Sequence, residues 1–307
     1  MSDIRSACSS FTLLLLIGGI AAAQDAASSH QLVKYSVVPQ RADSSVSRFT
    51  APNYVVFERQ TKSSAPLLVF MPGTDGVPNR TSDFADAAAH QGYRVIGLEY
   101  DDAPAVMQVC PRDPDPRCAE NFRRKRIFGQ GRFDAIDQRP GESIVERLSM
   151  LLASLDRDHP GEGWLDYLDN GRPAWSRIAV SGLSQGAGMA AYIAQTTRVA
   201  RVILFSSPWD SYGRNRTLAP WVRAGNGATP SSAWFAAYHE KEPTADLIAQ
   251  AYRALRIPST QIRIFTLEPN GRAEYHPSGV TNGGTPRRAD GLPAYLDDWK
   301  FLLGEAH

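Results

Sequence analysis

The stretch from Arg177 to Ala194, R-I-A-V-S-G-L-S-Q-G-A-G-M-A-A-Y-I-A, constrains the fold more than any other part of the chain. It begins with a β-branched, apolar run that suits a strand buried on both faces, and it ends in a small-residue helix pattern. Gly182 and Gly186 lie two residues either side of Ser184 and permit a tight turn where larger side chains would collide. The Ser184 hydroxyl would then lie at a helix N-terminus, whose N–H groups favour developing negative charge. The pattern predicts a nucleophilic serine, and a chance Gly-Ser-Gly loop is the competing interpretation.

Composition and charge narrow the class of protein. The chain has 307 residues, of which 43% are hydrophobic and 21% are charged, values that are typical of a soluble globular protein. This length is enough for one large α/β domain. The net charge of +1 provides no electrostatic footprint for nucleic acid or for an anionic membrane surface. We therefore expect no nucleic-acid partner.

Residues 1–23 have the pattern of a secretory signal peptide. Arg5 precedes an apolar segment at 11–22, and Ala21-Ala22-Ala23 offers a cleavage site before Gln24. The apolar segment is too short to be a stable membrane anchor, although an uncleaved anchor is the alternative interpretation. We expect an exported protein, periplasmic or secreted, with no membrane span after cleavage.

Cysteine usage agrees with export. Cys8 would leave with the signal peptide, so the mature chain keeps Cys110 and Cys118, which enclose a segment rich in Pro and Asp. In an exported protein, a close pair of this kind is most simply a disulfide. Two cysteines with no histidine nearby are too few ligands for zinc. We expect neither a metal nor a cofactor.

Strand-like and helix-like patterns alternate along the chain. Strands are predicted at 32–38, 54–57, 67–71, 94–100, 178–180, 202–205, 233–238 and 261–267, and helices at 81–92, 143–155, 187–194, 244–255 and 295–303. This alternation predicts an α/β fold with a mostly parallel sheet covered by helices on both faces. We interpret 24–52 as a linker and edge segment and 53–307 as one domain. The irregular insertion at 101–140 should lie over the strand ends and shape a pocket there.

Strand, G-x-S-x-G and helix in this order resemble the nucleophile elbow of α/β-hydrolases. The elbow G-L-S-Q-G-A-G is similar to the G-x-S-Q-G versions of cutinases and acyl-protein-thioesterase-like carboxylesterases. The P-G-T-D-G loop, the cysteine-bearing insertion, the S-I-V-E-R-L helix and the S-S-P-W-D segment are similar to a poorly characterised family of exported bacterial hydrolases. The resemblance covers about residues 53–303, and it implies an α/β-hydrolase fold that hydrolyses an ester or related acyl bond through an acyl-enzyme. Pro72 departs from the histidine of many members.

The resemblance implies a catalytic order of serine, acid and histidine along the chain. His276 lies in a loop after the last predicted strand, so we expect it to be the base, with a solvated loop histidine as the alternative. His239 occupies the region where the acid is expected. The other four histidines either precede Ser184 or end the chain.

Four carboxylates are candidates for the acid. Glu242 is favoured because it precedes Pro243 and a predicted helix, although a glutamate there departs from the more usual aspartate. Asp210, after the preceding strand, is the main alternative, and Glu240 and Asp246 are weaker ones. A carboxylate near a helix N-terminus can also be favoured by the helix dipole without any chemical role.

Two backbone N–H groups are candidates for an oxyanion site, which binds the charge that develops on a carbonyl oxygen. One belongs to Gln185, the residue after the serine. The other belongs to Thr74, in the glycine loop after the strand at 67–71. A plain turn is the competing interpretation of that loop, since Pro-Gly and Asp-Gly both favour turns.

The basic run Arg123-Arg124-Lys125-Arg126 allows two interpretations. It could attract an anionic substrate, but a solvated face is favoured. The leading functional hypothesis is a serine hydrolase of a carboxylic ester, with a small or polymeric substrate. An acyltransferase on the same scaffold and a non-catalytic exported binding protein are the alternatives.

Overall fold

The computed structural model describes residues 31–139 and 141–304. The predicted signal peptide at 1–23, with Cys8 and the cleavage site, lies outside the described residues, as does His307. Among the described residues, no helix combines the length and the apolar character needed to cross a bilayer.

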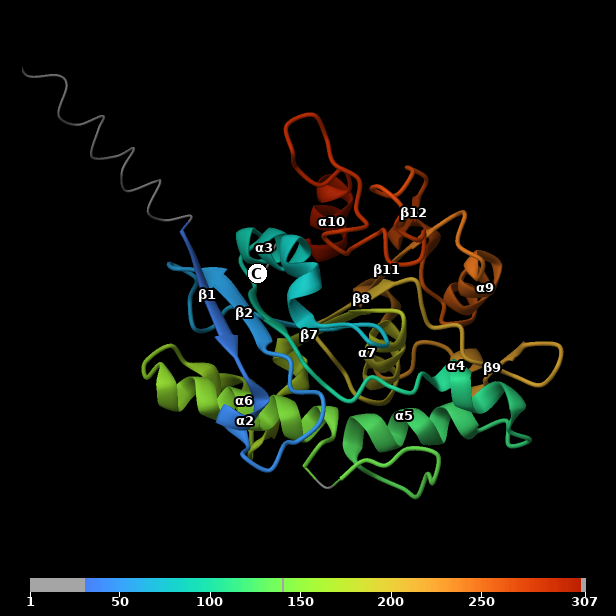
Figure 1. Ribbon diagram of the computed structural model, residues 1–307, viewed down its shortest axis with the longest axis horizontal. Helices are drawn as coiled ribbons and strands as arrows, with labels where there is room; N and C mark the ends of the chain where they lie inside the picture. The colour runs from blue at the N-terminus through green and yellow to red at the C-terminus, as the bar shows by residue number, and fades with distance from the viewer. Residues whose placement is uncertain (1–30, 140, 305–307) are drawn as a thin grey trace, which may run out of the picture.

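An eight-stranded sheet forms the centre of the molecule (Figure 1). β2 runs antiparallel to both of its neighbours, and every other pairing in this sheet is parallel. The prediction of a mostly parallel sheet is therefore confirmed. The spatial order of the strands, with the Ser184 turn directly after β7, is that of the α/β-hydrolase fold. In spatial order the strands are β1 (Leu32–Val37), β2 (Asn53–Glu58), β4 (Arg94–Gly97), β3 (Leu67–Met71), β7 (Ile178–Leu183), β8 (Arg201–Phe205), β11 (Trp234–His239) and β12 (Ile262–Phe265).

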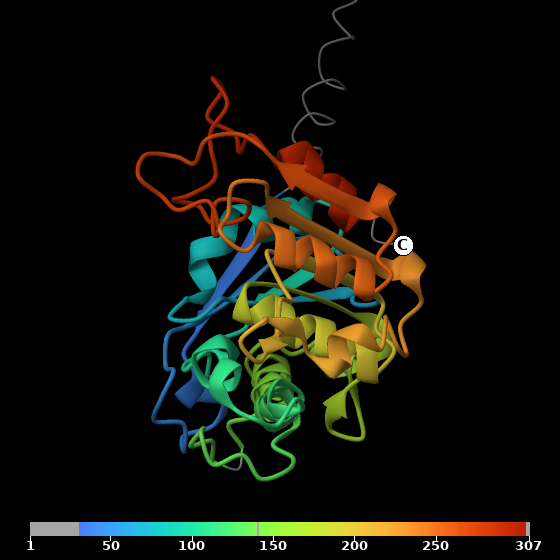
Figure 2. The ribbon, with the colours of Figure 1, turned by 90° about the vertical axis from the view of Figure 1, so that its right-hand side faces the viewer.

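Helices cover both faces of the sheet (Figure 2). α3 (Ser82–His90) and α10 (Leu296–Leu303) pack on one face. On the other face lie α6 (Ile144–Asp158), α7 (Gln185–Thr196) and α9 (Ala245–Ala254). Each face has its own apolar core, so the central strands β3 and β7 are buried along their whole length, as continuous apolar runs in a parallel sheet require.

Shorter elements complete the chain. They are the helices α2 (Pro39–Ala42) and α8 (Pro220–Arg223), the pairs β5 (Leu168–Asp169) with β6 (Arg172–Pro173) and β9 (Ser211–Tyr212) with β10 (Thr217–Leu218), and the 3₁₀ turns η1 (Pro78–Thr81), η2 (Cys110–Arg112), η3 (Trp164–Tyr167), η4 (Trp175–Arg177), η5 (Ser231–Ala233) and η6 (Ser259–Gln261).

The insertion at 101–140 contains two helices, α4 (Val106–Val109) and α5 (Cys118–Phe128), so the prediction of an irregular segment was wrong. The buried positions of α5 are 118, 119, 122, 123, 126 and 127, which is the spacing of one helix face. Two of these six buried residues are arginines, so apolar residues alone do not mark the buried face, and the sequence pattern did not indicate a helix here. The predicted disulfide is confirmed: Cys110 and Cys118 are bonded, with their Cα atoms 5.5 Å apart.

The close approach of β3 and β7 positions the serine turn. Met71 lies opposite Gly182 in the parallel register. A Cβ atom on Gly186 would lie 2.0 Å from the carbonyl oxygen of Met71, far inside van der Waals contact. The turn can therefore reach the end of β3 only with glycine at position 186.

We predict that Gly186→Ala lowers the free energy of unfolding by about 3 kcal/mol or more, because the added methyl must displace backbone rather than a flexible side chain. Urea unfolding measures the change. Gly283→Ala is the matched control, since a Cβ there meets no atom within 4 Å. Equal stability of the two variants would contradict the prediction.

Candidate active site

Ser184 occupies the turn between β7 and α7 in a conformation that few residues adopt. Its φ is 52° and its ψ is −116°, a combination that costs free energy in a residue with a side chain. Its backbone N–H donates to the carbonyl oxygen of Phe205 at 2.9 Å, which ties the turn to the end of β8. The side chain is partly exposed. The turn thus presents the hydroxyl at the carboxyl ends of the parallel strands, where open α/β sheets bind ligands.

Glu242 and His276 form a close pair. The carboxylate Oε2 lies 2.5 Å from the imidazole Nδ1, and the Glu242 side chain is completely buried whereas that of His276 is 24% exposed. The other oxygen, Oε1, accepts hydrogen bonds from the His239 backbone N–H at 2.8 Å and from the Ser206 hydroxyl at 2.9 Å. Three donors therefore offset the cost of burying the carboxylate. An Nδ1–H that donates to Glu242 leaves Nε2 free to accept a proton.

Two observations bring the sequence neighbours of Ser184 and the loop of His276 together. Ser206, the residue after Phe205, has its hydroxyl 3.1 Å from the carbonyl oxygen of His276. Leu183 and Pro277, the neighbours of Ser184 and His276 in sequence, line one cavity. Within the described residues, no hydrogen bond joins the Ser184 hydroxyl to the His276 ring. Such bonds are often long without substrate and tighten when substrate binds.

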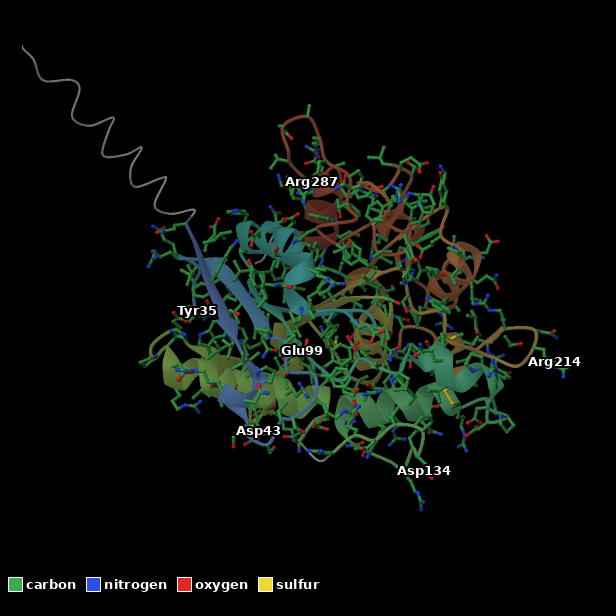
Figure 3. All side chains as sticks on the ribbon, viewed as in Figure 1. Tyr35, Asp43, Glu99, Asp134, Arg214 and Arg287 are labelled. Atoms are coloured by element: carbon green, nitrogen blue, oxygen red, sulfur yellow. A yellow bond between two sulfur atoms is a disulfide. The ribbon has the colours of Figure 1, made fainter. Side chains whose placement is uncertain are left out.

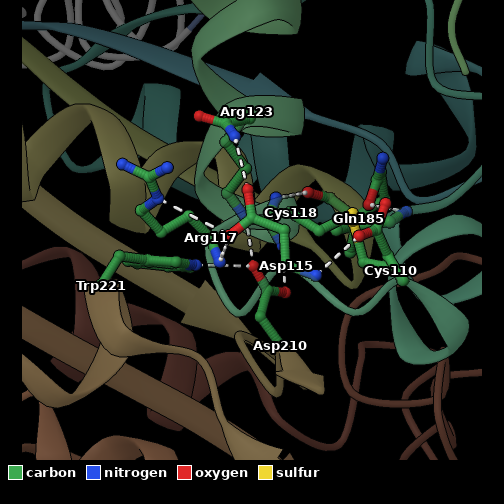
Figure 4. Close-up of a disulfide and its surroundings, with 11 residues drawn as sticks. Cys110, Asp115, Arg117, Cys118, Arg123, Gln185, Asp210 and Trp221 are labelled. Atoms are coloured by element: carbon green, nitrogen blue, oxygen red, sulfur yellow. Dashed lines mark hydrogen bonds and ion pairs between the residues drawn. A yellow bond between two sulfur atoms is a disulfide. The ribbon is translucent and has the colours of Figure 1, made fainter. Parts of the chain in front are cut away.

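The structure does not bring the other candidate acids to His276. Asp210 is buried and accepts hydrogen bonds from Arg123 Nε at 2.6 Å and from Trp221 Nε1 at 2.9 Å (Figure 4). Glu240 and Asp246 are exposed on the surface. Across residues 31–139 and 141–304, no group of three His, Cys, Asp or Glu side chains could hold a metal ion.

The basic run has a structural role that sequence reasoning missed. Arg123 pairs with Asp210, and Arg126 pairs with Asp101, with all four side chains nearly inaccessible to solvent. The interpretation of a solvated face is therefore wrong for these two arginines, and the charge of each is balanced by a buried aspartate. Arg124 alone of the run is exposed. The signal available in the sequence was helical spacing: had 118–128 been read as a helix, its apolar residues would have defined a buried face that includes Arg123 and Arg126.

The two candidate oxyanion donors lie at neighbouring strand ends. Gln185 begins α7, so its N–H has no acceptor within the helix. Thr74 follows Gly73, and a Cβ atom added to Gly73 would lie only 3.2 Å from the Ser184 Cβ. The loop that carries Thr74 is held by Asp102, a residue that sequence reasoning did not single out. Its carboxylate accepts from the N–H groups of Asp75 at 3.3 Å and Gly76 at 3.2 Å.

Asp102 generates a prediction about pH. Burial raises the pKa of Asp102 to about 7, and the carboxylates of Asp75 and Asp101 add to the rise against the two N–H donors. The unfolded pKa is about 3.9, so between these values the folded state binds more protons than the unfolded state. The contribution of Asp102 to the free energy of unfolding must then fall as the pH rises from about 4 to about 7.

We therefore expect the stability of the wild type relative to Asp102→Asn to decrease between about pH 5 and pH 8, because the variant has no carboxyl to ionise. Urea unfolding at both pH values measures this difference. A difference that is constant with pH, or that grows, would contradict the assignment.

The buried Asp210 generates a second prediction. Asp210→Asn should lower the free energy of unfolding by about 3–5 kcal/mol, because it leaves the buried Arg123 charge unpaired. Asp134→Asn is the control: Asp134 projects from the surface in Figure 3, and its pair with Arg132 is exposed, so we expect a loss of about 1 kcal/mol or less. Chemical denaturation compares the two, and a comparable loss in both would refute the structural role of Asp210.

Comparisons with known proteins concern the fold only. No protein-family model matches the sequence, and a search of curated proteins gives no match. A solved structure of a putative dienelactone hydrolase from Klebsiella pneumoniae is 14% identical, over 90% of this chain and 98% of that one, with a TM-score of 0.43. Esterase 2 of Thermogutta terrifontis, phosphorylated by paraoxon, is 12% identical over 87% and 90%, with a TM-score of 0.44. At these values the similarity carries no information on substrate.

Proposed function

We propose that the protein is a serine hydrolase that cleaves a carboxylic ester through an acyl-enzyme. In this proposal Ser184 is the nucleophile, His276 the base and Glu242 the acid that orients it, with the N–H groups of Gln185 and Thr74 as the oxyanion site. The observation that carries the proposal is the hydrogen bond between the buried Glu242 carboxylate and the His276 ring, and the positive φ of Ser184 supports it. The joint arrangement matches the requirements of nucleophilic catalysis.

In the first half of the reaction, the Ser184 oxygen attacks the ester carbonyl carbon while His276 Nε2 accepts the hydroxyl proton. Negative charge develops on the carbonyl oxygen, where the two backbone N–H groups stabilise it. Glu242 holds the ring by Nδ1 and stabilises the imidazolium that forms. The tetrahedral intermediate then collapses: the bond to the alcohol oxygen breaks, and His276 donates its proton to that oxygen.

In the second half, water replaces the alcohol. His276 accepts a proton from the water, whose oxygen attacks the acyl carbonyl. Collapse of the second intermediate breaks the bond to Ser184, which regains its proton from His276. The carboxylic acid leaves, and the site returns to its starting protonation.

Export to the periplasm or the medium belongs to the same proposal. The apolar segment and small-residue site before Gln24 support it. The Cys110–Cys118 disulfide supports it as well, because structural disulfides persist in oxidising compartments.

The function predicts covalent labelling by a fluorophosphonate probe. The purified protein should be labelled stoichiometrically and hydrolyse p-nitrophenyl acetate, and Ser184→Ala should lose both. His276→Ala and Glu242→Gln should lower kcat/KM by about 10⁴-fold or more while the melting temperature of His276→Ala stays nearly unchanged. Intact-mass spectrometry and initial rates make the measurements. Labelling that persists in Ser184→Ala would remove Ser184 as the nucleophile, and absence of labelling from the wild type would remove the proposal in favour of a binding protein.

A further inference from the structure

Two cavities of unequal size flank Ser184. The smaller has a volume of about 40 Å³, and Ser184 and Gln185 line it together with Val106, Met107 and Trp209. The larger has a volume of about 130 Å³, and Thr74, Leu183 and Pro277 are among its lining residues. The insertion contributes to the smaller cavity, since Val106 and Met107 belong to α4.

The chemistry of the proposed function assigns one part of an ester to each cavity. His276 must donate a proton to the leaving alcohol oxygen, so the alcohol lies on the side of His276. Pro277, the next residue, lines the larger cavity. The smaller cavity has a separate set of lining residues that includes Gln185 and none from the His276 loop. The acyl chain, which extends away from the leaving group, then enters the smaller cavity.

The walls of the smaller cavity are held by buried contacts. Arg123 and Asp210, which also line it, form a buried ion pair, and Asp210 accepts a further hydrogen bond from Trp221. The Gln185 side chain accepts from the Val106 N–H at 3.3 Å and ties α4 to the serine turn. The disulfide joins the end of α4 to the start of α5 (Figure 4). Expansion of the cavity would break several of these contacts.

The volume sets the size of chain that fits. The volume of about 40 Å³ is the space open to the centres of water molecules, and on that measure the cavity has room for about three waters, or about three methylene groups. Acyl groups of two to about four carbons fit on this measure, and longer ones must displace side chains that line the cavity, among them Met107 and Trp209.

We propose that Met107 and Trp209 restrict the acyl group of the substrate to short chains, from acetyl to butyryl, while the larger cavity admits a bulkier alcohol. This inference rests on the proposed function, and it adds the substrate class: short-chain acyl esters. Both side chains are half-buried, so replacing either with alanine opens the cavity without removing a core residue.

The test is the dependence of kcat/KM on chain length, measured with p-nitrophenyl acetate, butyrate, hexanoate and octanoate. In the wild type, octanoate should be at least about 100-fold poorer than butyrate, since one misfitting methylene alone can account for about 10-fold or more. Met107→Ala and Trp209→Ala should each raise the ratio of kcat/KM for hexanoate to kcat/KM for acetate by about 10-fold. Met150→Ala, an exposed methionine on α6, is the matched control and should keep the wild-type profile.

The alcohol side is tested with 1-naphthyl acetate, which the wild type should hydrolyse at least as efficiently as phenyl acetate, whose leaving alcohol is smaller but of similar acidity. Equal rates on octanoate and acetate in the wild type, or an unchanged profile in both alanine variants, would overturn the inference and leave the esterase proposal intact. If no ester is hydrolysed, the proposed function fails, and labelling of Ser184 by methyl and octyl fluorophosphonates decides the cavity assignment. Faster labelling by the methyl probe supports it; equal rates, or no labelling by either probe, overturn it.

Discussion

The approach of two backbone segments, the turn after β7 and the end of β3, is the constraint on which the rest of the site depends. Glycine at 186 lets the turn lie against the Met71 carbonyl, and the same approach brings the loop that holds Thr74 beside Ser184. The proposed nucleophile and both candidate oxyanion donors therefore share one junction between adjacent parallel strands. Asp102 adds two hydrogen bonds to the loop at that junction.

Buried charge organises the rest of the strand ends. Arg123 of α5 pairs with Asp210, which fastens the insertion to the loop after β8, and Arg126 pairs with Asp101, which holds α5 against the start of the insertion. Removing one partner of such a pair is costly because the other charge stays buried. The pairs thus give the insertion a defined position beside the serine. Because Asp210 is paired with Arg123, its role is structural, whereas Glu242 faces His276. Glu242 is buried too, but its partners are a histidine, a hydroxyl and a backbone N–H.

Most strands and helices of the fold were predicted from patterns within short stretches of the sequence. Alternating apolar runs located the eight strands of the main sheet, and Ser143 caps α6 through the Glu146 N–H as a helix start of that type does. The pattern failed in α5, where arginines occupy inner positions and remove the apolar stripe on which periodicity depends. Asp102 carried no signal either, because its partners are backbone groups of Asp75 and Gly76, far away in the sequence.

The sequence by itself determined the α/β order, the glycine-flanked turn around Ser184, and a histidine placed after the last strand, because each depends on residues close together in the chain. Only the tertiary structure decided which carboxylate faces His276 and where the arginines of the basic run lie. Four carboxylates share similar local surroundings in sequence. The choice among them depends on which cation or ring each meets across the fold: Asp210 meets Arg123, and Glu242 meets His276.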